Sequence, residues 1–129
     1  MSQILCSNIR LARLFNGLSL AELGEKLGKS KQFLSRVETG AEPVSSPLEY
    51  ALVEHLGILP DFLRHVDPMP LTEEQCHFRR QLTTKVALRQ YARARGEMLK
   101  RLVCVLDDYL DLPEYGIAEG DPSSEEAIE

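Results

Sequence analysis

The chain has 129 residues, of which 43% are apolar and 27% charged, enough for one globular domain with a shorter appendage but not for two full domains. Aromatic residues make up only 6% and tryptophan is absent, so leucine, valine and alanine must form the core. This core composition favours helices over a β-sandwich, and we expect an all-α fold. The longest uncharged apolar stretch, residues 102–106, is far shorter than the roughly 20 residues that span a bilayer, and residues 1–11 lack a secretory signal. We therefore expect a cytoplasmic protein with no membrane partner.

The formal net charge of -5 is unevenly distributed. Residues 1–66 carry seven Lys/Arg and seven Asp/Glu, residues 67–113 carry eight and seven, and residues 114–129 carry none and six. The negative charge therefore belongs to the last segment, which is also rich in Gly, Pro and Ser and is expected to be an acidic flexible tail. The neutral body remains compatible with a nucleic-acid partner.

Start and stop signals predict five short helices that share one core between residues 8 and 65. The first ends at Asn16-Gly17, with Arg10 and Arg13 on its outer face. The others are a helix from a capping box at Ser19 and Glu22 to Gly28, one from Ser30 to Gly40, one with Pro47 in its first turn that ends at Gly57, and a fifth over residues 60–65.

Pro68 and Pro70 mark a boundary, because the residue before a proline disfavours the helical conformation. Thr72 and Gln75 form a second capping-box signature that predicts a short helix over residues 72–81, followed by a long amphipathic helix over residues 85–112. We accordingly divide the chain into residues 1–66, a helical linker or dimerisation region at 67–113, and the tail at 114–129. A basic series could form a second phosphate-binding strip, but we interpret it as a solvated flank of an amphipathic helix, because Glu97 lies four residues from both Arg93 and Arg101. Its members are Arg79, Arg80, Lys85, Arg89, Arg93, Arg95, Lys100 and Arg101.

Residues 18–40 carry the functional signal. Two capped helices joined by a tight turn at Gly28 predict helix-turn-helix geometry, in which the second helix projects from the body. Its outer face is polar and almost free of acid. Lysine and arginine can donate to guanine, and glutamine can bond adenine with two hydrogen bonds, so the sequence predicts a reader of the DNA major groove.

The strings Gly17-Leu18-Ser19, Leu27-Gly28-Lys29-Ser30 and Leu34-Ser35-Arg36-Val37-Glu38-Thr39-Gly40 have the spacing of a known family. Residues 6–65 resemble the XRE helix-turn-helix regulators of the phage-repressor type, which have five helices. The resemblance implies that bases are read by Lys31, Gln32, Ser35 and Arg36, and that Ser30 and Thr39 contact phosphate. Leu20 stands where the family usually has a glutamine that contacts the DNA backbone, so we expect this phosphate contact to be absent.

The segment from Phe78-Arg79-Arg80 to Tyr109-Leu110-Asp111-Leu112-Pro113 resembles the region that joins such a domain to an ImmA/IrrE-type zinc metallopeptidase. The H-E-x-x-H motif of that peptidase does not occur in the 129 residues. The cysteines Cys6, Cys76 and Cys104 are expected to be reduced and mostly buried, and they form no chelating set with the three histidines. We therefore expect no metal, no cofactor and no catalytic activity in this chain.

The function expected from these observations is sequence-specific binding of double-stranded DNA by a transcriptional regulator, a repressor that acts as a homodimer. The alternative is a protein-interaction module, antitoxin-like or the regulatory segment of a peptidase, whose partner would be a toxin or a peptidase. The expected dimer contact is the apolar stripe of the long helix, which could otherwise pack on the N-terminal domain. Its members are Leu99, Leu102, Val103, Leu106 and Leu110.

Overall fold

The computed structural model describes residues 4–67, 70–72 and 85–110, and every regular element in these ranges is helical. The elements are α1 (Cys6–Phe15), α2 (Leu20–Leu27), α3 (Lys31–Thr39), α4 (Ser46–Leu56), the 3-10 helix η1 (Pro60–Arg64) and α5 (Val86–Tyr109). The all-α fold is confirmed, with the fifth predicted helix present as a single 3-10 turn. Residues 73–81 of the expected short helix and the tail at 114–129 lie outside the described residues.

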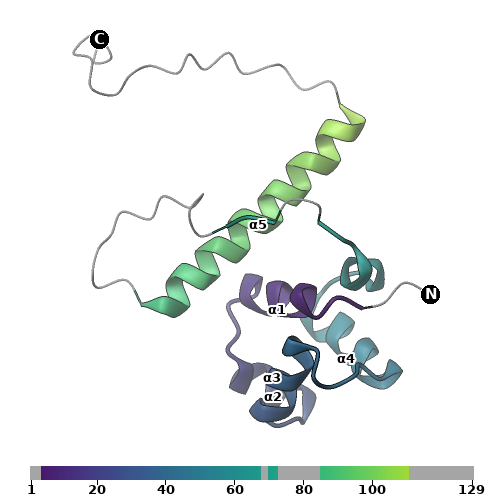
Figure 1. Cartoon of the computed structure of the whole chain (residues 1–129), viewed down its shortest axis with the longest axis vertical. Helices are drawn as coiled ribbons and strands as arrows, with labels where there is room; N and C mark the ends of the chain where they lie inside the picture. Colours follow the sequence, from purple (N-terminus) through teal and green to yellow (C-terminus); the bar gives the residue numbers. More distant parts are fainter. Residues whose placement is uncertain (1–3, 68–69, 73–84, 111–129) are drawn as a thin grey trace.

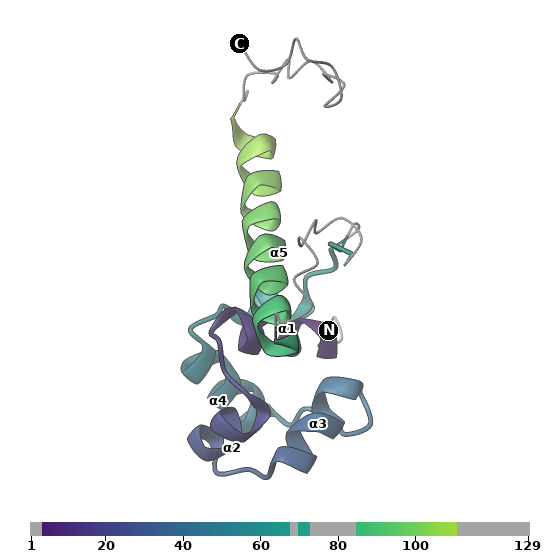
Figure 2. The same ribbon diagram turned by 90° about the vertical axis from the view of Figure 1, so that its left-hand side faces the viewer.

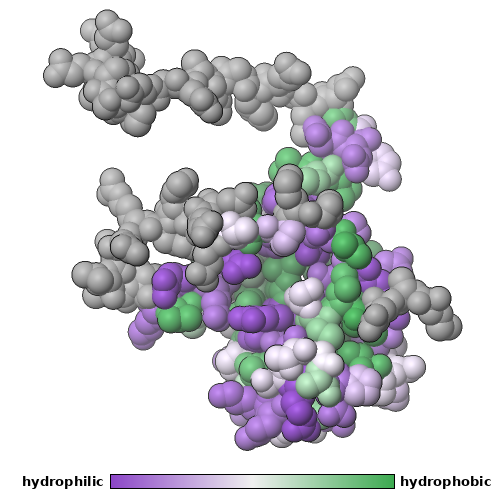
Figure 3. All heavy atoms as spheres, viewed as in Figure 1, coloured by the Kyte–Doolittle hydropathy of each residue, from purple (hydrophilic) through white to green (hydrophobic). Residues whose placement is uncertain are grey.

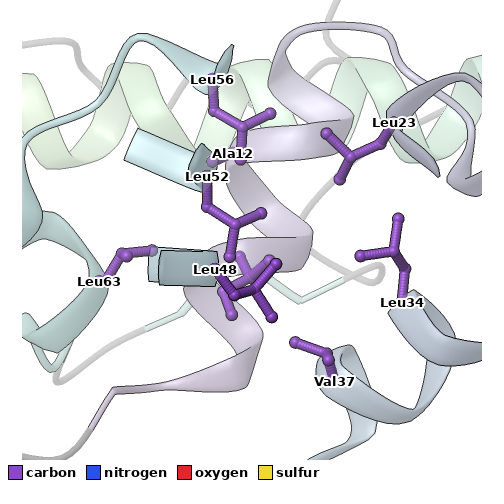
Figure 4. Packing of buried hydrophobic residues seen from close by; sticks show 9 residues of the cluster. Ala12, Leu23, Leu34, Val37, Leu48, Leu52, Leu56 and Leu63 are labelled. Carbon is purple, nitrogen blue, oxygen red and sulfur yellow. The ribbon is translucent and has the colours of Figure 1, made fainter. Parts of the chain in front are cut away.

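The core lies where α1, α2, α3, α4 and η1 meet (Figure 4). Each helix contributes the apolar residues that its sequence period places on one side, and η1 contributes the buried Leu63 with the half-buried Phe62 beside it. Complete burial of such a side chain stabilises the fold by roughly 1.5–3 kcal/mol, as an upper estimate. The buried members are Ile9, Ala12, Leu23, Leu34, Val37, Leu48, Leu52, Leu56 and Leu63.

α1 lies between this core and α5. Ile9 and Ala12 face the core, whereas Leu11 and Leu14 are half-buried and line a pocket together with Ala94 of α5. Figure 2 shows the lower end of α5 lying across α1, with the rest of α5 standing away from the body, and Figure 1 shows α5 running obliquely past α1. One side of residues 90–101 therefore packs on the body. The projecting half of α5, residues 98–109, contacts the body only through this side of its first turn.

A polar network holds the base of α5. Glu97 is only 5% exposed, and its carboxylate accepts hydrogen bonds from the backbone N–H of Leu71 and from Arg101. Arg101 also pairs with Asp67 at 3.2 Å and donates to the side-chain oxygen of Asn8 at 3.2 Å. The prediction of a solvated flank is therefore wrong at Arg101, whose side chain is only 15% exposed, and Glu97 fastens the segment around Leu71 to α5.

α5 ends earlier than the predicted limit of residue 112. Leu110 is already extended, with φ of -130° and ψ of 130°, and Asp107 and Asp108 place negative charge in the last turn, where the helix dipole disfavours it. Of the thiols expected to be buried, Cys6 is half-buried but Cys104 is exposed on α5. Both are free, and Cys76 lies outside the described residues.

Candidate nucleic-acid interface

The turn between α2 and α3 is fixed by close contacts that the sequence signals anticipated. The Ser19 hydroxyl accepts from the backbone N–H of Glu22, and the Glu22 carboxylate accepts from the backbone N–H of Ser19 at 2.7 Å, so the predicted capping box is present. Hydrogen bonds from the side chain and the backbone of Ser19 hold the pKa of Glu22 below its ordinary value. Gly28 ends α2 with a φ of 61°, in the left-handed region that suits glycine.

Gly24 is a second requirement of this turn, and the sequence analysis did not single it out. A Cβ atom at this position would lie 2.5 Å from the backbone carbonyl oxygen of Lys29 and 3.8 Å from a methyl group of Leu34. The first of the two distances is too short for any side chain. The start of α3 can therefore approach α2 this closely only because residue 24 is glycine.

The outer face of α3 carries the predicted base-reading residues together. Lys31, Gln32 and Arg36 are exposed and Ser35 is half-buried. With about 100° of rotation per residue, these four residues and Thr39 occupy one face, opposite the buried Leu34 and Val37. The cations and the amide are therefore available to a ligand that approaches this face, as the sequence predicts.

The two predicted phosphate contacts differ in their availability. The Ser30 hydroxyl caps α3 by accepting from the backbone N–H of Phe33 at 3.2 Å, which leaves its own proton free to donate. The Thr39 hydroxyl donates to the carbonyl oxygens of Ser35 and Arg36, each at 3.1 Å. A phosphate contact by Thr39 therefore requires its hydroxyl to turn away from its own helix.

Arg36 has a partner that the sequence analysis missed. Its guanidinium lies 3.4 Å from the carboxylate of Glu42, just beyond the end of α3, and the two side chains are 56% and 35% exposed. An exposed pair of this kind contributes about 0–1 kcal/mol. Opening it to let Arg36 reach a base therefore costs little.

An ion pair beneath the interface fixes the position of α3. Arg13 of α1 and Glu38 of α3 are joined by two hydrogen bonds of 2.6 and 2.8 Å, with 8% and 7% of their side chains exposed. Arg13 also donates to the carbonyl of Leu18 at 2.8 Å. The prediction that Arg13 lies on an outer face is wrong. Its position one residue after Ala12 and four after Ile9 puts it on the buried side of α1.

A groove runs from α3 to the start of α5. Lys31, Ser35 and Thr39 line one side of it, and Gln90 and Tyr91 of α5 line the other. The residues between them belong to the end of α1 and the start of α2, and they include the half-buried Leu20. Leu20 has no side-chain donor, so it cannot make the backbone contact that a glutamine would make there.

The five residues predicted for dimerisation do not pack on the N-terminal domain. These residues are between 39% and 60% exposed. Four of them lie on the projecting half of α5, namely Leu99, Leu102, Val103 and Leu106, and Leu110 follows directly after the helix end. Apolar spheres are visible on that half in Figure 3. The alternative in which the domain of the same chain covers this stripe is therefore wrong.

The described residues offer neither a metal site nor a membrane-spanning helix. Within residues 4–67, 70–72 and 85–110, no three histidine, cysteine or acidic side chains are grouped as a metal ion would require. No helix in the same ranges is long and apolar enough to cross a membrane.

The two capped helices, the close turn and the polar face of α3 define a helix-turn-helix domain. Comparison with protein-family models agrees: residues 9–63, from α1 to η1, match the model described as helix-turn-helix. Residues 9–63 are thus similar to helix-turn-helix domains, in agreement with the geometry of α2 and α3. No curated protein and no solved structure matches the chain. Since the match ends at residue 63, the resemblance of the later segment to the linker of ImmA/IrrE-type proteins stays a prediction.

Proposed function

We propose that this protein is a sequence-specific DNA-binding transcriptional repressor that inserts α3 into the major groove and binds as a homodimer. The observation that carries the proposal is the face of α3, where Lys31, Gln32 and Arg36 are exposed together while Leu34 and Val37 anchor the opposite side. Lysine and arginine match the acceptors of guanine, and glutamine matches the donor and acceptor of adenine. In this arrangement Ser35 is a fourth contact to the bases.

The surroundings of α3 support this assignment. The pair between Arg13 and Glu38 holds the helix rigidly against α1, and the Ser30 cap leaves the positive end of the helix dipole open to an approaching phosphate. Ser30 and Thr39 stand at the two ends of α3, as contacts to the flanking backbone would require. One helix of this length reads only a few base pairs, so specificity calls for two copies on half-sites about 34–36 Å apart.

A selection experiment tests the proposal. The full chain is incubated with a random pool of double-stranded oligonucleotides, and the bound fraction is amplified over several rounds. We expect enrichment of one short half-site in two inverted copies about one helical turn apart. A promoter that overlaps the selected site should be silenced by the protein in a reporter assay. A pool that gains no preferred sequence would refute the proposal.

The exposed stripe of α5 favours a second candidate, a protein-interaction module with a toxin or peptidase partner. The two candidates differ in what the isolated chain does. If the chain alone retains one DNA sequence against an excess of competitor, DNA binding is its own function. If selective retention appears only after a partner protein is added, the second candidate is correct.

A further inference from the structure

The projecting half of α5 carries a wide apolar face. With about 100° of rotation per residue, its exposed apolar side chains span an arc of about 160°. They are Leu99, Leu102, Val103, Val105, Leu106, Tyr109 and Leu110. An uninterrupted face of this width on a solvent-exposed helix marks an interaction surface.

The centre of this face points away from the domain that α5 packs on, whereas Val105 and Tyr109 at its edge lie about 20° and 60° around the helix from Ala94. Ala94 and Glu97 are the buried residues of α5 and mark the side that faces the body. The line through Leu99, Val103, Leu106 and Leu110 lies about 180° around the helix from that side. The domain of the same chain therefore neither covers this line nor obstructs a helix that approaches it.

We propose that a second copy of the chain covers this face, with the two α5 helices antiparallel. The spacing of four, three and four residues from Leu99 to Leu110 is that of a two-helix seam. In the antiparallel register Leu99 lies opposite the partner's Leu110, and Val103 opposite the partner's Leu106. The proposal rests on the proposed function and specifies how its dimer is built.

The charged residues beside the apolar line favour antiparallel over parallel α5 helices. Lys100 and Asp107 occupy the same flank, seven residues apart, so antiparallel helices bring each Lys100 beside the partner's Asp107, twice in the dimer. Parallel helices would instead bring Arg95 beside the partner's Lys100, which places like charges together twice. Lys100 already lies 3.1 Å from Asp67 and 3.8 Å from Glu97, and its ammonium has three donors, so it can also serve the partner's Asp107.

The size and spacing of this pairing suit a DNA-binding dimer. Six partly exposed apolar side chains from each of two chains, those of the face other than Val105, supply an area on the order of 1,000 Å², which a specific interface requires. The symmetry point lies midway between residues 104 and 105. At about 1.5 Å per residue, the two copies of Ala94, where the domains attach, are then about 32 Å apart along the helix axis. Half-sites one turn apart are separated by about 34–36 Å.

A distance measurement distinguishes the two directions. Leu88 is exposed near the start of α5, and Leu88→Cys in the full chain, with Cys6, Cys76 and Cys104 changed to serine, gives one site for a spin label. Pulsed electron paramagnetic resonance should give a distance of about 50 Å between the two spin labels in an antiparallel dimer. A distance below about 25 Å, as expected for parallel helices, or a monomer at tens of micromolar would overturn the inference.

A charge reversal adds a test that leaves the apolar seam intact. Asp107→Lys should raise the dimer dissociation constant about fivefold to tenfold, because two attractive pairs become repulsive. Asp108→Lys is the matched control, since Asp108 lies away from the seam, and should change the constant less than about twofold. Equal effects of the two variants would contradict the register. DNA retention is measured on the same samples. Specific DNA binding together with a short label distance refutes the antiparallel pairing of α5 but not the proposed function. A long label distance without DNA selectivity refutes the proposed function but not the antiparallel pairing.

Discussion

Removal of one partner from the buried pair of Arg13 and Glu38 should be among the most damaging single changes in the domain. Each side chain is more than nine-tenths buried, so Glu38→Leu leaves the guanidinium without its carboxylate, and Arg13→Met leaves the carboxylate without a cation. Stranding a buried charge in this way costs about 3–5 kcal/mol. Since a domain of 60–100 residues loses about 4–8 °C in Tm per kcal/mol, either variant should melt at least 12 °C below the parent, by roughly this scaling.

The double variant gives the sharper test. Arg13→Met together with Glu38→Leu buries no charge, and only the carbonyl of Leu18 loses a donor, at about 1 kcal/mol. We expect the double variant to be more stable than either single variant in urea denaturation followed by circular dichroism. Glu42→Gln, which breaks the exposed pair with Arg36, is the control and should cost less than about 1 kcal/mol. Single losses below about 1 kcal/mol, or additive losses in the double variant, would refute the claim that this pair fixes α3.

Two further predictions concern the turn that presents α3. Gly24→Ala should destabilise the domain by about 1–3 kcal/mol in urea denaturation because its Cβ meets the Lys29 carbonyl oxygen, whereas Gly28→Ala, with open space around it, should cost only the strain of a left-handed alanine, about 1–2 kcal/mol. Only Gly24→Ala should also weaken DNA binding, and equal DNA affinity for both variants would argue against a role for this close approach. Ser19→Ala should cost about 0.5–2 kcal/mol and raise the pKa of Glu22 towards its ordinary value in an NMR titration. Because the pKa of Glu22 is depressed in the folded state, the stability that its carboxylate contributes is present above its ordinary pKa and is lost as the pH falls through the folded-state pKa. A pKa of Glu22 that is the same in the parent and in Ser19→Ala would contradict the capping box.

The helices of the N-terminal domain could be predicted because their signals are local. Each of these signals depends only on residues a few positions apart: the serine caps, the terminal glycines and the apolar period. The helices from α1 to α4 follow them. The exposed face of α3 follows from the same period. These features do not depend on which distant segments the helices meet.

The long-range polar contacts could not be predicted in this way. Whether Arg13 points to solvent depends on Glu38, which lies 25 residues further along the chain, and whether Glu97 is solvated depends on the backbone N–H of Leu71. The role of Gly24 likewise becomes visible only when the carbonyl of Lys29 is placed beside it. In α1 a signal was nevertheless present, since Arg13 shares the helix face of Ile9 and Ala12.

The central claim is that the exposed face of α3 reads DNA bases, and a comparison of base preferences tests it most directly. Binding of Lys31→Ala, Gln32→Ala and Arg36→Ala to the selected site and to each single-base variant of that site is measured by fluorescence anisotropy at fixed salt. Each substitution should cost about 1–3 kcal/mol on the selected site and relax the preference at its own base position. Lys26→Ala, which removes an exposed lysine from α2, should leave every preference unchanged. If all three α3 variants keep the preferences of the parent, α3 does not read the sequence.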